Sequence, residues 1–336
     1  MSKQLSRQFN LKDNFLLLTA FFILLLNKHL QGYLLHTFLF DILIVTTAVM
    51  SLSFLGKFVA NFSGITNSIN SLAFHFYFTL GFYFFILVAF SFFLTGIPLL
   101  IFFPSIFLIA IFYAIKLDKK SSAHPDLKIF ENSAFEPFII PLTLLLLLFY
   151  VNPGGFNPLI YYPDVVTALD NHPRGMEFFF LPFAFLKLKY AVPLISIYFL
   201  FFSCILGTRF FSNKNKTIPF FTFFILVAPE TLQTFFLPQP FFPCLYFILL
   251  TLLLFLKKIE PHQKINFYCL LAVVLALLYP YYCFIPLFFL LFDGCKTLKL
   301  FNFLLIVTFL LAPFLLWTFW NSGQFYFCQS QILNFK

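Results

Sequence analysis

The sequence predicts an all-α fold, a polytopic integral membrane protein with about eleven transmembrane helices. Of its 336 residues, 61% are hydrophobic and 10% are charged, whereas soluble domains carry about 25% charged residues. The apolar residues occur in repeated runs near the roughly 20 residues that a helix needs to cross the hydrocarbon core of a bilayer. Barrel strands would instead appear as alternating segments of about ten residues. Helical spans therefore explain both the composition and the pattern.

The predicted spans follow one another along the whole chain. In order they cover residues 15–30, 33–56, 72–94, 97–115, 137–151, 190–207, 218–227, 236–256, 266–279, 281–292 and 300–320. The first is expected to remain uncleaved, because no small-residue cleavage site follows it. The stretch 266–292 is too long for one ordinary span, so Pro280 at its middle is interpreted as a turn between two short helices. The chain thus divides into an N-terminal four-helix membrane segment, residues 1–130, and a second membrane segment, residues 131–336, which contains a polar loop at 152–189.

Positive charge predicts the orientation of these spans. With the N-terminus in the cytoplasm, the connections at 57–70, 116–136, 208–217, 257–265 and 293–299 are cytoplasmic, and each carries Lys or Arg. The opposite connections carry few cations and hold the acidic residues Asp164, Asp170, Glu177 and Glu230. This distribution follows the positive-inside rule. The membrane is expected to be the plasma (inner) membrane. It also accounts for the net charge of +9 without a nucleic-acid partner.

Several chemistries lack their usual sequence signals. The six cysteines show no short paired spacing, so neither a disulfide framework nor a cysteine-based metal site is expected. Phosphate-binding loops, dinucleotide fingerprints, HExxH and GxSxG motifs are absent from the sequence. Most of the 60 phenylalanines are expected to face lipid tails and are given no functional role.

The polar loop holds most of the candidate chemistry. Asp164 follows Pro163 and two aromatic rings, Tyr161 and Tyr162, in a turn that would present a carboxylate at the membrane surface. Such a carboxylate suits sugars, or phosphates bridged by a divalent cation, and Asp164 is accordingly the predicted metal ligand. The alternative role is an N-cap for a short helix at 165–169.

A second group of polar residues follows within the same loop. Asp170, His172, Arg174 and Glu177 are close enough in sequence to converge on one spot. Histidine transfers protons near neutral pH and arginine holds phosphate in a bidentate fork. The alternative is a solvated loop whose ion pairs contribute little.

The loop ends on the same side as another acidic turn. Residues 178–186 are apolar but too short to span, so they are expected to lie along the outer interface, followed by Lys187 and Lys189 near anionic groups. Glu230 follows Pro229 at the end of a short apolar run, with Gln233 nearby, and is either a functional carboxylate at the membrane boundary or an exposed loop residue.

Three polar residues are predicted inside spans. His36 and Asp41 stand about one helical turn apart in the second span, and His75 lies in the third. They suit either a proton relay or interhelical hydrogen bonds.

This arrangement resembles the membrane-embedded glycosyltransferases of the GT-C type. An apolar span at 137–151 is followed by Asp164, by the turn His172-Pro173-Arg174-Gly175, by the apolar stretch 178–186 and by a series of spans, and the resemblance covers residues 137–320. It implies transfer of a sugar from a polyprenyl-phosphate donor to a lipid or glycan acceptor on the non-cytoplasmic face. It also implies Asp164 as base or metal ligand, with Arg174, Lys187 and Lys189 holding phosphate.

Two other functional classes stay open at this stage. The first is a transporter or flippase for a lipid-linked or hydrophobic substrate, with the proline-broken helices at 238–243 and 280–286 as hinges. The second is a non-catalytic partner subunit in envelope assembly. The candidate catalytic residues are Asp164, Asp170, His172, Glu177 and Glu230, and the candidate substrate-binding residues are Tyr161, Tyr162, Arg174, Lys187, Lys189 and Gln233.

Overall fold

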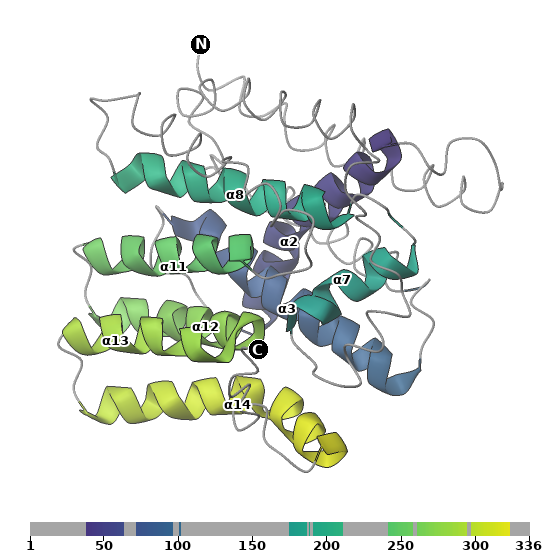
Figure 1. The fold of residues 1–336 in the computed structure, drawn as a ribbon. Coiled ribbons are helices and arrows are strands. Elements are labelled where there is room, and N and C mark those ends of the chain that lie inside the picture. The colour runs from purple at the N-terminus through teal and green to yellow at the C-terminus, as the bar shows by residue number, and fades with distance from the viewer. Residues whose placement is uncertain are drawn as a thin grey trace, which may run out of the picture.

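The computed structural model describes residues 38–63, 72–96, 101, 175–186, 188, 191–210, 241–257, 261–293 and 297–322, and every regular element among them is helical. The all-α prediction is therefore confirmed for this part of the chain. The elements are α2 (Phe38–Ser63), α3 (Ala73–Thr95), α7 (Gly175–Phe185), α8 (Ala191–Phe210), α11 (Phe241–Leu256), α12 (Pro261–Leu278), the 3-10 turn η3 (Pro280–Cys283), α13 (Phe284–Phe292) and α14 (Thr297–Ser322) (Figure 1).

The helix boundaries agree with the predicted spans to within a few residues for α3, α8 and α14. The predicted division at Pro280 is confirmed, because α12 ends at Leu278, Tyr279 is extended and the 3-10 turn begins at Pro280. Two boundaries differ. Helix α2 continues from Gly56 to Ser63 because those residues remain largely apolar, and α12 begins at Pro261, a residue whose fixed φ suits the first helical position.

Two segments among the described residues, Ala73–Thr95 and Leu300–Trp317, are long and apolar enough to cross a membrane. Shorter apolar helices cover Phe241–Leu256, Lys264–Leu278 and Pro280–Phe292. The predicted spans at 15–30, 137–151 and 218–227, and nearly all of 97–115, lie outside the described residues.

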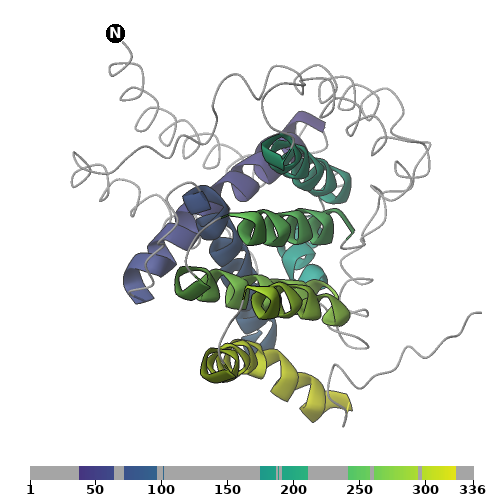
Figure 2. The same ribbon diagram turned by 90° about the vertical axis from the view of Figure 1, so that its left-hand side faces the viewer.

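The helices form a stack crossed by a pair. Helices α8, α11, the α12–α13 hairpin and α14 lie above one another, and α2 and α3 run across them (Figures 1 and 2). Helices α2 and α3 are antiparallel and touch through their backbones, because a Cβ on Gly56 would overlap the Tyr77 carbonyl oxygen and one on Gly81 would overlap that of Leu52. Glycine at both positions permits this approach.

The helices have two distinct ends. Lys264, near the start of α12, pairs with Asp293, which follows α13, so the two helices are antiparallel. The end of the hairpin that holds this ion pair is called here the charged end. The C-terminus of α11 also lies there, because the Phe255 carbonyl oxygen accepts a hydrogen bond from Lys264. The other end, called the aromatic end, contains Tyr279–Cys283. The C-terminal halves of α3 and α14 lie at this end, since Phe178 of α7 contacts both Phe90 and Phe314.

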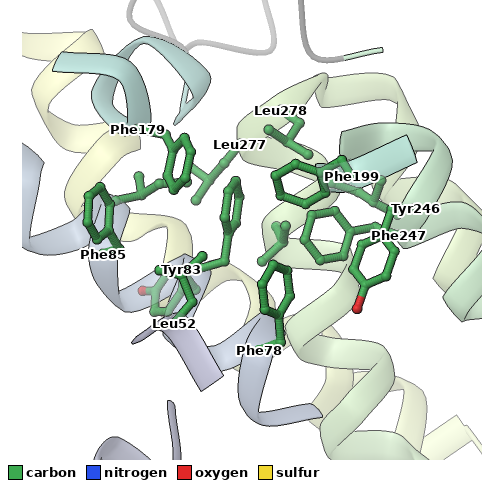
Figure 3. Close-up of a cluster of buried hydrophobic side chains, with 14 of the residues drawn as sticks. Leu52, Phe78, Tyr83, Phe85, Phe179, Phe199, Tyr246, Phe247, Leu277 and Leu278 are labelled. Carbon is green, nitrogen blue, oxygen red and sulfur yellow. The ribbon is translucent and has the colours of Figure 1, made fainter. Parts of the chain in front are cut away.

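Aromatic rings fill the space between the helices. Phe82 contacts Phe179, Phe199 and Phe247 with ring centroids 4.7, 5.6 and 5.4 Å apart. Figure 3 shows the last three of these rings within the buried cluster. The expectation that the phenylalanines mostly face lipid is wrong for α3 and α7, whose Phe78, Phe82, Phe179 and Phe183 are among the largest fully buried side chains.

Helix α7 corrects the expected interfacial position of residues 178–186. A helix forms there, but Phe178–Leu181, Phe183 and Ala184 are buried against α3, α8 and α12. The physical reason lies in the sequence: residues 178–186 contain no charged or polar side chain. A helix without a polar face gains nothing from lying between water and lipid, and it is instead enclosed by its neighbours.

Candidate functional site

The predicted site residues lie almost entirely outside the described part of the chain. This applies to Tyr161, Tyr162, Asp164, Asp170, His172, Arg174, Lys187, Lys189, Glu230 and Gln233. Glu177 is placed in the first turn of α7, but its side chain is not described. Their predicted convergence therefore stays a prediction.

The point where the polar loop enters the described structure is nevertheless fixed. Gly175, directly after Arg174, is buried, and a Cβ added to it would lie 2.6 Å from the Leu277 Cβ and 3.1 Å from the Leu277 carbonyl oxygen. Only glycine fits this contact without displacing α12. Position 175 of the polar loop is thus held at the aromatic end by its contact with Leu277, which lies two residues before Tyr279.

The aromatic end presents tyrosines from the turn that joins α12 to α13. The ring of Tyr279 is partly buried against the core, and its centroid lies 5.8 Å from that of Tyr281 and 5.1 Å from that of Tyr282, both of which are exposed. Partial burial is the largest cause that raises the pKa of Tyr282 above its usual value, and the nearby Cys244 and Tyr279 raise it further. This phenol therefore remains a neutral hydrogen-bonding group at neutral pH.

The charged end holds a polar cluster that the sequence analysis did not predict. The Lys264 ammonium donates to the two Asp293 carboxylate oxygens at 3.3 and 3.1 Å and to the Phe255 carbonyl oxygen at 3.3 Å. The Tyr268 hydroxyl donates to the same carboxylate at 3.1 Å. Lys264 is only 2% exposed and Asp293 13%. Buried charges require such pairing, which joins α11, α12 and α13.

Lys264 and Asp293 had been assigned to separate cytoplasmic loops, and that assignment is wrong for Lys264, which lies in α12. The available signal was the position of two opposite charges at the two ends of a predicted hairpin. Lys264 is neutralised by Asp293, so Lys257 and Lys258 carry the positive charge of the connection at 257–265.

His75 forms an interhelical hydrogen bond, one of its two predicted roles. Its Nδ1 atom lies 2.9 Å from the Tyr246 hydroxyl oxygen, and the Thr79 hydroxyl donates to the His75 carbonyl oxygen at 2.6 Å. All three side chains are buried. The contact joins α3 to α11. His36 lies outside the described residues, and the side chain of Asp41 is not described, so the relay itself is untested.

Among the residues that the structure describes, no group of three or more His, Cys, Asp or Glu side chains could hold a metal ion. The predicted ligand Asp164 lies outside them. The described Cys244 and Cys283 are free thiols.

Comparison of the chain with family models, with curated proteins and with solved structures finds no match. No likeness to another protein therefore assigns a role to any residue.

Proposed function

We propose that the chain is a polytopic membrane protein of about eleven helical spans that transfers a sugar from a polyprenyl-phosphate donor to a lipid or glycan acceptor on the non-cytoplasmic face. Its N-terminus is cytoplasmic, and its membrane is the plasma (inner) membrane. The observation that supports this proposal most directly is the contact of Gly175 with Leu277. It attaches the polar loop to the aromatic end, opposite the charged end.

The two ends correspond to the two sides that the basic residues predict. The charged end is continuous with the Lys-containing connections at 257–265 and 293–299, which the positive-inside rule assigns to the cytoplasm. The aromatic end contains Tyr279–Cys283 and position 175 of the polar loop, both assigned to the opposite side. A single orientation therefore satisfies the loop charges and the helix directions together.

The proposed reaction uses the loop residues in defined roles. An acceptor hydroxyl oxygen attacks the anomeric carbon of the donor sugar while the bond from that carbon to the phosphate oxygen breaks. Asp164 takes the hydroxyl proton, or binds a divalent cation that holds the phosphate, and polyprenyl phosphate leaves. Asp170, His172, Glu177 and Glu230 are the other candidate proton-transfer groups. Arg174, Lys187 and Lys189 hold the phosphate, and Tyr161, Tyr162 and Gln233 contact the sugar.

Orientation is tested by cysteine labelling in a Cys-free background. An impermeant thiol reagent added from the outer side should modify a cysteine at Asn157 and spare one at Ser121. The reverse pattern would place the polar loop in the cytoplasm and remove the proposed site from the outer face.

Activity is tested by incorporation of labelled sugar into lipid extracts. Asp164→Asn should abolish incorporation with normal expression, because an amide can still cap a helix but cannot act as a base. Asp118→Asn, in a connection predicted to be cytoplasmic, is the matched control and should remain active. Full activity of Asp164→Asn would reduce Asp164 to a capping residue, as expected in a non-catalytic partner subunit.

The transporter alternative is separated by a second pair of variants. A transferase should lose donor affinity in Arg174→Ala, because charge-assisted hydrogen bonds to phosphate contribute about 1.5–3 kcal/mol each. It should tolerate His36→Ala. A proton-coupled transporter should show the opposite sensitivity, since its relay crosses the membrane.

A further inference from the structure

Helices α13 and α14 each carry a row of exposed apolar side chains. On α13, Phe284, Phe288 and Phe292 are exposed at intervals of four residues, and on α14 Phe301, Leu305 and Phe309 repeat the same interval. Residues four apart lie on one side of a helix. The opposite side of α14 is enclosed, since Phe303, Leu311 and Phe314 are buried. The exposed residues therefore form one apolar side on each helix, and the two sides are together called here the α13–α14 face.

We infer that this α13–α14 face contacts the acyl chains of membrane lipids, and that it does not bind a second copy of the chain or another protein. This inference rests on the membrane arrangement proposed above. It adds which surface of the protein the lipid acyl chains contact. A large exposed apolar surface requires a partner in any protein, because such patches on soluble monomers rarely exceed a few hundred square ångströms.

Charge and length favour hydrocarbon as that partner. Residues 300–322 contain no charged side chain, whereas protein interfaces combine an apolar centre with a polar rim. Among the side chains that the structure describes in this segment, the exposed polar ones are Asn302, near the start of α14, and Thr308, whose hydroxyl can be satisfied by its own helix. The 26 residues of α14 span about 39 Å at about 1.5 Å per residue, enough to cross a core of roughly 30 Å.

The two ends of the face also match the two surfaces of a bilayer. Trp320, Tyr281 and Tyr282 are exposed at or near the aromatic end, and Trp and Tyr prefer the membrane–water interface. Lys296 and Lys299 lie in the sequence at the opposite end, as expected for the cytoplasmic side.

Fluorescence quenching by brominated lipids tests the inference, because Trp317 and Trp320 are the chain's two tryptophans. In a Trp317→Phe/Trp320→Phe background, a tryptophan placed by Phe309→Trp should be quenched several-fold more by bromine at mid-chain depth than one placed by Phe303→Trp. These positions are 75% and 2% exposed on the same helix. A tryptophan at position 309 that is quenched no more than at position 303 would show that protein covers the face, and the inference would be wrong.

A second measurement needs no new aromatic residue. The native Trp320, observed alone in Trp317→Phe, should be quenched best by bromine near the headgroups, since it lies at the end of α14. Quenching of both reporters by aqueous iodide, with none by bromolipid, would overturn the lipid contact. Sugar incorporation by the same preparations measures the transferase activity separately. A failure of the lipid contact and a failure of the proposed transferase activity can therefore be told apart.

Discussion

Helices α3 and α14 are almost equally apolar but occupy opposite environments. Their most apolar segments have mean hydropathies of 2.1 and 2.3, yet 56% of the first is buried inside the protein and only 17% of the second. Hydropathy thus predicts that each is a helix able to enter a membrane, but it does not distinguish a central helix from a peripheral one.

The two helices differ in their small and polar residues. Helix α3 contains Gly81 at a backbone contact, His75 bonded to Tyr246, and Tyr83 bonded to the Leu310 carbonyl oxygen of α14. The exposed positions Phe301, Leu305 and Phe309 of α14 are apolar. Small residues allow helices to approach closely, and polar residues in an apolar medium need partners. These residues, more than average hydropathy, mark the side that faces protein.

The largest predicted difference is between two phenylalanines. Phe82→Ala should destabilise the protein by about 3–5 kcal/mol, because Phe82 is fully buried among Phe179, Phe199 and Phe247 and its removal leaves a cavity. Phe309→Ala on the exposed side of α14 should change stability little. Unfolding of both variants by denaturing detergent measures the difference. Equal losses would mean that the face of α14 is as enclosed as the centre.

The charged cluster gives a comparable effect through a different cause. Lys264→Ala leaves the Asp293 carboxylate without its cation in a largely buried place, which should cost about 3–5 kcal/mol. The double variant Lys264→Met/Asp293→Leu should recover most of that loss, because it removes both charges and keeps apolar volume. Thermal unfolding in micelles compares the single and double variants. A single variant as stable as the wild type would show that water or lipid headgroups reach the carboxylate.

The glycine contact should produce a smaller loss. Gly81→Ala introduces a Cβ where the Leu52 carbonyl group lies, and both are backbone positions that cannot rotate away. The helices must separate, at a cost of about 1–3 kcal/mol for an overpacked site. Gly96→Ala is an informative control, since nothing lies within 4 Å of its added Cβ but its φ is 65°. It should lose about 1–2 kcal/mol from backbone strain alone. Detergent unfolding combined with crosslinking between α2 and α3 separates the two causes, because only Gly81→Ala should move the helices apart.

The sequence was sufficient for the helical class of the described residues, for several helix boundaries and for the turn at Pro280, because these depend on local apolar runs and on a residue that interrupts them. It was insufficient for α7. The short run 178–186 was assigned to a membrane surface, whereas only the tertiary structure shows that α3, α8 and α12 enclose it. Long-range pairing was also missed: Lys264 and Asp293 are distant in sequence, and neither residue alone indicates the other.

The candidate site divides in the same way. Residue types and order predicted which side chains the polar loop contributes, and Gly175 shows where that loop joins the helices. Whether Asp164, His172 and Arg174 converge depends on contacts between segments far apart in the chain, which composition and spacing do not specify. His75 shows the difficulty, since its partner Tyr246 is separated from it by 171 positions.

The smallest predicted effect concerns a hydrogen bond that joins the two helices compared above. The Tyr83 hydroxyl donates to the Leu310 carbonyl oxygen at 2.8 Å, in the turn preceding Pro313 of α14. Figure 1 shows that α14 is bent along its length, as a proline inside a helix favours. Tyr83→Phe removes only the hydroxyl and should cost about 0.6 kcal/mol, and at most about 1.7 kcal/mol, as found for hydrogen bonds between membrane helices. Tyr281→Phe, at an exposed ring that belongs to neither helix, should be neutral. Detergent unfolding gives the stability, and the infrared band of a labelled Leu310 carbonyl should shift in Tyr83→Phe alone. A loss of stability without that shift would attribute the effect to packing and not to the hydrogen bond.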